Sequence, residues 1–235
     1  MKFRIDLKIF MLIILFLITN QIKIYAMIMI FAIIHEFGHL LAGILLGMKP
    51  EKIEIKPFGV SIKFDIKRED YNIKIGKGNL LELKKIFVAL AGPLTNALII
   101  MILMMYDSLK INEYDIMIMI FSNMTLILFN ILPIYPLDGG RILKSIIYMM
   151  KGKRVAEKYI YIISYITLII ITMISSIAIL YLKNIAIFLV IIFLWGLQMR
   201  EYKIYENRKL LYKIIRQEMN QYDKKDIPIE NKITN

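Results

Sequence analysis

Hydrophobic residues occur along this chain in long runs that are separated by shorter charged connections. Six such runs are visible, at residues 7–19, 24–48, 86–105, 116–132, 159–182 and 185–199. A helix needs about 20 apolar residues to cross the hydrocarbon core of a bilayer. The pattern therefore predicts an all-α polytopic membrane protein with about six transmembrane helices, of which the first and the last are short.

One connection carries a different pattern. Val60–Lys67 alternates strictly between apolar and polar residues, and Lys52–Lys56 and Asn72–Ile75 alternate more briefly. A period of two residues is typical of a β-strand with one polar face. We therefore expect a small membrane-associated β-sheet within about residues 50–78.

The basic residues are distributed unevenly among the connections. Residues 49–85, 141–158 and 200–216 are rich in Lys and Arg, whereas residues 106–115 hold one Lys against three acidic residues. Because Lys and Arg are enriched in cytoplasmic loops, we expect the N- and C-termini and the sheet to be cytoplasmic. This topology also accounts for the net charge of +12, so the basic excess requires no nucleic acid partner.

Composition narrows the classes further. The chain is 58% hydrophobic, has no cysteine and has two histidines, which excludes a disulfide-stapled domain and a thiolate metal site and disfavours a disordered chain. Met1–Ile18 starts like a signal peptide but has no Ala-x-Ala cleavage site, so we interpret it as part of the first span. Residues 1–199 form the expected six-span domain.

Residues 200–235 are expected to form a short basic cytoplasmic tail. Leu210, Leu211, Ile214 and Ile215 have helical spacing. Two interpretations of this segment remain open, an interfacial amphipathic helix and a solvated flank of the last span.

The second span contains His35-Glu36-Phe37-Gly38-His39. Helical residues four apart share a face, so His35 and His39 can offer two imidazole nitrogens to one metal ion. Glu36 lies next to that face and can act as a general base. Polar residues in the middle of a span are costly, which favours this reading over simple hydrogen bonds between helices.

A catalytic zinc ion commonly has three protein ligands and an open position for water. With no third histidine and no cysteine, the third ligand must be a carboxylate, and Asp138 is the best candidate. It follows the fourth span, after Pro133 and Pro136 and before a Gly-Gly pair, where the backbone can turn back into the protein. The alternative is that Asp138 caps the next helix.

Together these residues resemble the site-2 protease family of intramembrane zinc metalloproteases. The matching elements are HEFGH at 35–39, Ala91-Gly92-Pro93 followed by Asn96, and the segment from Asn130 through Leu137-Asp138-Gly139. Within the family the chain is most similar to the stage IV sporulation protein FB group. The elements of this closer match are Pro57-Phe58-Gly59 before an alternating strand, LPIYPLDGGR at 132–141, and Glu201-Tyr202.

The resemblance implies one zinc ion per chain held by His35, His39 and Asp138. It also implies that Glu36 activates water, that Asn130 contacts substrate and that the strand near Val60–Lys67 pairs with an unwound substrate segment. The implied substrate is a membrane-associated protein, a pro-sigma factor in the sporulation group, and inhibitory membrane proteins are the implied partners. The implied setting is the membrane of a bacterial cell, with an active site that opens to the cytoplasm.

The chain departs from the sporulation group in two respects, and two alternative functions remain open. The tail is too short for the nucleotide-sensing CBS domain found in many members of that group, and a PDZ module is absent. A polytopic metal transporter could use the same His and Glu, although the outer halves of the spans are almost wholly apolar. A catalytically inactive client-binding relative is disfavoured because Glu36 is present. A homo-oligomer is compatible with the sequence.

Overall fold

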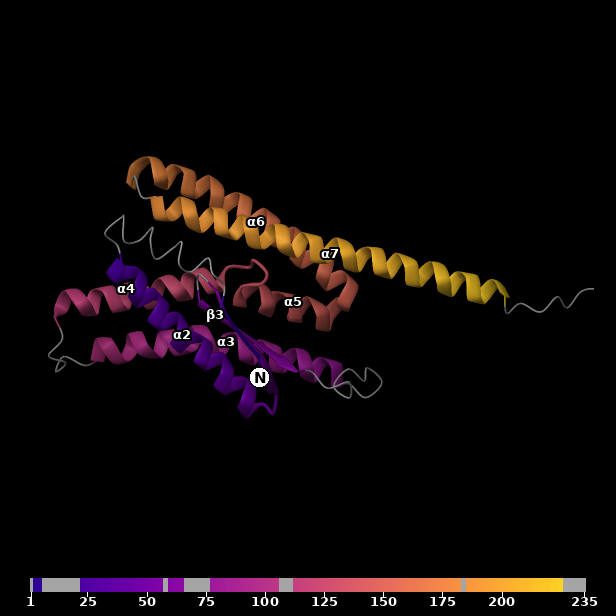
Figure 1. Cartoon of the computed structure of the whole chain (residues 1–235), viewed down its shortest axis with the longest axis horizontal. Coiled ribbons are helices and arrows are strands. Elements are labelled where there is room, and N and C mark those ends of the chain that lie inside the picture. Colours follow the sequence, from indigo (N-terminus) through magenta and orange to yellow (C-terminus); the bar gives the residue numbers. More distant parts are fainter. Residues whose placement is uncertain are drawn as a thin grey trace, which may run out of the picture. The chain divides into compact units, whose positions relative to one another are not determined.

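The computed structural model describes residues 2–5, 22–56, 59–65, 77–105, 112–182 and 185–225. These residues belong to two compact units, Met1–Thr167 and Leu168–Asn235. The fold is mostly helical (Figure 1). Its elements are β1 (Lys2–Ile5), α2 (Ile22–Leu45), β2 (Lys49–Lys56), β3 (Gly59–Asp65), α3 (Lys77–Met105), α4 (Glu113–Ile131), α5 (Asp138–Lys151), α6 (Lys153–Leu182) and α7 (Ile185–Lys225).

Four helices of the described part are long and apolar enough to cross a membrane. They are Ile22–Leu45, Asn79–Met105, Glu113–Ile131 and Lys153–Ile177, and they coincide with the second to fifth predicted spans. The first predicted span lies outside the described residues. The sixth forms the first part of α7 and is not among these four helices, so the count of six remains a prediction.

The four helices carry large apolar side chains on their outer faces. Leu98, Met104, Leu128 and Ile174 are each more than half exposed. Such surfaces are unfavourable in water and are compatible with the hydrocarbon of a bilayer, where the helix satisfies its own backbone hydrogen bonds. This distribution supports an integral membrane protein.

The core of the first unit lies where α2, α3 and α4 meet. Phe31, Ala32 and Leu126 form its buried centre, and Ile99 packs against them from α3. The helices approach closely because of Gly38, at which a Cβ atom would lie 2.2 Å from Thr95 Oγ1 on α3. This close approach holds the HEFGH turn of α2 directly against α3.

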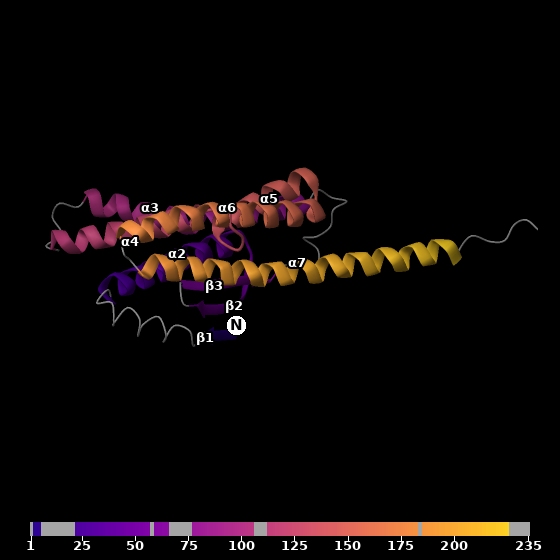
Figure 2. The same cartoon turned by 90° about the horizontal axis from the view of Figure 1, so that it is seen from above.

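The three strands form one sheet in the order β1-β2-β3, with β1 parallel and β3 antiparallel to β2. Figure 2 shows β3 as the strand next to α2, and Phe64 of β3 packs over Gly43 of α2. The alternating segments Lys52–Lys56 and Val60–Lys67 fall on β2 and β3, although β3 ends at Asp65. The pattern does not predict β1, and Asn72–Ile75 lies outside the described residues.

The second unit contains the end of α6 and the whole of α7. Trp195 Nε1 donates a hydrogen bond to Thr172 Oγ1 over 3.1 Å and so links the two helices. The helix α7 continues without interruption to Lys225. The predicted helical pattern of the tail is thus confirmed as far as that residue.

Candidate metal centre

The helix α2 brings the two histidines of the chain together. His35 and His39 are one helical turn apart, and both are buried, with 3% and 2% of their surfaces exposed. Their Nε2 atoms lie 3.1 Å apart, and their rings meet edge to face. The local geometry of one helix is therefore sufficient to pair these two nitrogens.

The third member of the site comes from the start of α5. The chain leaves α4 at Ile131 and re-enters a helix at Asp138. Leu137 is the N-cap residue of α5 and no side chain caps this helix, so the capping alternative for Asp138 is wrong. Gly139 is required at this turn because a Cβ atom there would lie 2.0 Å from the carbonyl oxygen of Ile131.

The loop before Asp138 is held by a buried side chain from α6. The backbone N–H of Tyr135 donates to Ser164 Oγ over 2.9 Å, and Ser164 Oγ donates to the carbonyl of Pro133 over 3.4 Å. Lys144 of α5 lies over the Tyr135 ring, 4.3 Å from its centre. These contacts fix the loop from both sides and thereby set the position of Asp138.

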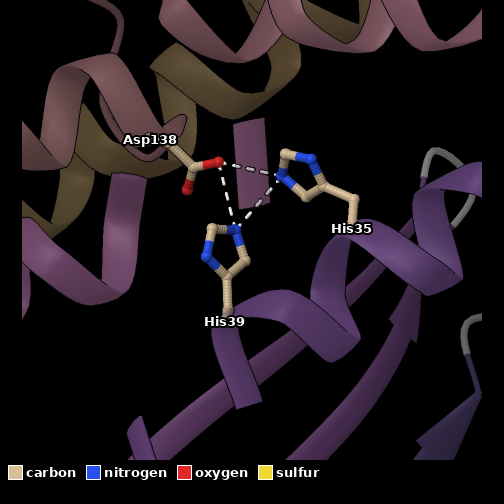
Figure 3. Close-up of side chains that lie close together, drawn as sticks. All are labelled: His35, His39 and Asp138. Carbon is tan, nitrogen blue, oxygen red and sulfur yellow. Dashed lines mark hydrogen bonds and ion pairs between the residues drawn. The ribbon is translucent and has the colours of Figure 1, made fainter. Parts of the chain in front are cut away.

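The Asp138 carboxylate and both imidazoles point toward one spot (Figure 3). Asp138 Oδ2 lies 3.0 Å from His35 Nε2 and 3.1 Å from His39 Nε2, and Oδ1 lies 3.5 Å from an Arg141 nitrogen. The positive charge of the neighbouring Arg141 favours the ionised form of Asp138, whose oxygen atoms then act as acceptors.

The Nδ1 atom of each imidazole is within hydrogen-bond distance of an oxygen atom that can only accept a hydrogen bond. His35 Nδ1 lies 3.1 Å from Asn96 Oδ1, and His39 Nδ1 lies 2.6 Å from the carbonyl oxygen of Val88. Both rings therefore carry their proton on Nδ1 in the neutral state, which leaves the Nε2 lone pairs facing Asp138. Three buried acceptors then converge with no hydrogen between them, an arrangement that a cation stabilises.

The arrangement fits a zinc ion. A tetrahedral ion about 2.0 Å from each ligand atom separates these atoms by ~3.3 Å, close to the three distances observed. Two imidazoles and one carboxylate are a ligand set found in catalytic zinc sites, and the oxygen partner behind each histidine is also typical of them. Among the described residues, His35, His39 and Asp138 form a group whose ligand atoms lie close enough together to hold a metal ion.

Of the other two predicted site residues, Glu36 lies beside the ligand group, and Asn130 lies elsewhere on α4 of the same unit. Glu36 is half-buried on α2 and within electrostatic range of His39, Asp138 and Arg141. Asn130 is half-buried near the end of α4 and donates through Nδ2 to the carbonyl of Leu126, over 3.0 Å. The contact of Asn130 with substrate remains a prediction.

Three residues support the site although the sequence predicts no role for them. They are Gly92, Asn96 and Ser164, of which Gly92 and Asn96 lie in the Ala91-Gly92-Pro93 motif that is followed by Asn96. A polar amide in the middle of an apolar span is itself a signal of function. The spacing of four residues between Gly92 and Asn96 places both on one face of α3.

Gly92→Ala is expected to abolish metal binding. A Cβ atom at Gly92 would lie 2.4 Å from His39 Cε1 and 2.5 Å from the Nε2 atoms of His35 and His39. Neither ring can move away without breaking the hydrogen bond at its Nδ1 atom. We therefore also expect the free energy of unfolding to fall by roughly 1–3 kcal/mol. Zinc content and thermal unfolding of the purified variant check this result.

Gly196→Ala is the matched control, because nothing lies within 4 Å of a Cβ atom at this helical glycine. It should keep the zinc content of the wild type and gain up to about 0.5–1 kcal/mol in stability. Wild-type zinc content in Gly92→Ala would contradict the proposed geometry.

Comparison with known families and proteins identifies the family of the chain and agrees with its fold. Residues 8–134 match the family model described as Peptidase M50B-like, and residues 109–174 match Peptidase family M50. The chain belongs to the M50 peptidases, the site-2 protease family of membrane metallopeptidases. The prediction of family membership is thereby confirmed.

Two curated relatives are similar over about half of the chain. A zinc metalloprotease of Methanocaldococcus jannaschii is 27% identical over 133 residues, which are 55% of this chain and 35% of that protein. The stage IV sporulation protein FB of Bacillus subtilis is 26% identical over 128 residues, 54% of this chain and 41% of that protein. The match thus spans well under half the length of either relative.

A solved structure shows the same fold. The site-2 protease from Methanocaldococcus jannaschii matches with a TM-score of 0.61 at 22% identity, over 84% of this chain and 88% of that one. The fold of this chain is therefore that of a site-2 protease.

Proposed function

We propose that this protein is an intramembrane zinc metalloprotease that hydrolyses a peptide bond of a membrane-associated protein. The observation that carries the proposal is the convergence of His35, His39 and Asp138 on one buried spot, with Glu36 beside it on α2. His35, His39 and Asp138 would hold one zinc ion per chain. A zinc ion bound there supplies Lewis acidity toward water and the peptide carbonyl.

Glu36 is the proposed general base. Its carboxylate would accept a proton from the water that attacks the carbonyl carbon, and would deliver that proton to the amide nitrogen as the C–N bond breaks. Arg141 would keep Asp138 oriented during this step, through the contact described above. Asn130 is proposed to contact the substrate.

The edge of β3 is proposed to bind the substrate segment. β3 pairs with β2 on one side and has no further strand on the other side among the described strands. Phe64 packs β3 against Gly43, one helical turn beyond His39. An extended segment added to this edge would form backbone hydrogen bonds close to the helix that carries the histidines.

We place the active site toward the cytoplasm. His39 lies six residues before the end of α2 at Leu45, a depth of ~9 Å from that end of the helix. The basic residues of the connections lie at this end of the spans, whereas the acidic pair Glu113 and Asp115 lies at the start of α4. The distribution of Lys and Arg then supports cytoplasmic termini in a six-span topology.

The similarity to a sporulation protein supports a pro-sigma factor as the substrate class. An inhibitory membrane protein is the proposed partner, and the bilayer is the proposed medium. A metal transporter and an inactive client-binding protein are the alternative outcomes of the test below.

Removal of the metal is expected to stop proteolysis reversibly. The purified protein in liposomes is incubated with a membrane-associated pro-sigma factor and, in parallel, with single-span test proteins. Cleavage should disappear after treatment with a zinc chelator and return when zinc is added back.

Each other outcome contradicts the proposal in a defined way. Cleavage that survives complete loss of zinc would refute a metalloprotease. Zinc flux across the liposomes without cleavage would identify a transporter. Binding of the test proteins without cleavage would identify an inactive relative, and cleavage of the single-span proteins alone would refute the pro-sigma class.

A further inference from the structure

Asn96 is a fully buried amide in the middle of an apolar helix. It lies on α3, four residues after Gly92, and none of its surface is exposed. Gly92 faces the two imidazoles closely enough that a Cβ atom there would collide with both. On this face of α3, the absence of a side chain at Gly92 leaves room for the two imidazole rings. One turn further along, the amide of Asn96 contacts the His35 ring.

The amide has one partner among the described residues, and that partner is His35. Asn96 Oδ1 accepts from His35 Nδ1 over 3.1 Å, whereas Asn96 Nδ2 is buried without a hydrogen-bond partner in the described structure. An unpartnered buried donor lowers stability, and a leucine of similar size would fill the same space without it. Packing alone therefore does not account for an amide at this position.

The two histidines are oriented by different means. His39 is held by a backbone carbonyl, that of Val88, which no substitution at Val88 removes. His35 is held by a side chain, that of Asn96. The orientation and the tautomer of the His35 ring therefore depend on one replaceable group.

We propose that Asn96 is a positioning residue of the metal centre. By accepting the Nδ1 proton of His35, its amide oxygen directs the Nε2 lone pair toward the zinc position between His35, His39 and Asp138. The inference rests on the proposed zinc site and adds a residue to it. Asn96 does not touch the metal or the substrate in this role.

Three variants of the full-length protein test the proposal. Asn96→Leu removes the acceptor, Asn96→Asp keeps an acceptor oxygen but removes the unpartnered donor, and Asn123→Leu is the matched control. Asn123 is an equally buried asparagine on α4, whose Nδ2 donates to Met119 of its own helix and whose Oδ1 has no partner in the described structure. The hydrogen-bond partners of the two histidines in the described part of the chain do not include Asn123.

The measurement is zinc affinity, obtained by competition with a chelator of known affinity in detergent. We expect Asn96→Leu to bind zinc roughly 10- to 100-fold more weakly than the wild type, as is typical when the partner of a metal-bound histidine is lost. Asn96→Asp should bind zinc about as tightly as the wild type, because a carboxylate also accepts from Nδ1. Asn123→Leu should be unchanged.

The possible results separate this inference from the function on which it rests. A wild-type protein that binds no zinc would overturn the proposed function itself. Wild-type affinity in Asn96→Leu would overturn only the role of Asn96, as would an Asn96→Asp variant as weak as Asn96→Leu. Equal losses in Asn123→Leu and Asn96→Leu would assign the effect to helix packing. If Asn96→Leu does not fold, the affinity of Asn96→Asp decides the question.

Discussion

The Glu36→Gln variant is expected to retain its zinc ion and to lose peptide-bond hydrolysis. Glutamine has the shape of glutamate but cannot accept a proton from water, so the chemical step loses its proposed base. The three proposed ligands are untouched by the change. We expect the rate to fall by roughly 10²- to 10⁴-fold, with about one zinc ion still bound per chain.

The measurement is co-expression with a membrane-associated pro-sigma factor, followed by quantification of cleaved product and of zinc in the purified protein. Glu82→Gln serves as the matched control. Glu82 is a buried glutamate that pairs with Lys85 over 2.6 Å on α3, and it is not part of the metal-ligand group. Equal cleavage by Glu36→Gln and the wild type would refute the assignment of the general base.

The Asp138→Ala variant is expected to lose most of its zinc. It removes one of three proposed ligands and leaves two imidazole nitrogens, which are too few for a stable site in this class. Activity should fall with metal content. Zinc per chain in the purified protein, measured by elemental analysis and normalised to protein concentration, checks the result.

Asp115→Ala is the control for this variant. Asp115 at the start of α4 forms an ion pair with Lys23 over 2.5 Å, away from the metal-ligand group, and both side chains are partly exposed. Its loss should cost at most about 1 kcal/mol of stability and leave zinc content unchanged. Unchanged zinc in Asp138→Ala would remove Asp138 from the ligand set, and Asp138→Asn repeats the test without a change in volume.

The structure brings together the three residues that the sequence predicts as metal ligands. His35 and His39 could be paired from the sequence because the geometry of one helix is local and periodic. Asp138 could be named only by elimination, since the composition left no other class of third ligand. The elimination named Asp138, but it did not show how Asp138 reaches the two histidines.

The sequence by itself therefore determined an apolar helical chain, the pairing of two histidines on one helix and a strand near residue 60, and it predicted a carboxylate as the third metal ligand. These features depend on local periodicity and composition. Only the tertiary structure decided that Asp138 reaches His39 and His35 across 99 and 103 residues of chain, that Ser164 holds its loop, and that Gly92 and Asn96 face the imidazoles. Such contacts join side chains from different helices. Helical spacing and the hydrophobic pattern describe single segments, so they do not predict the distances between side chains of different helices.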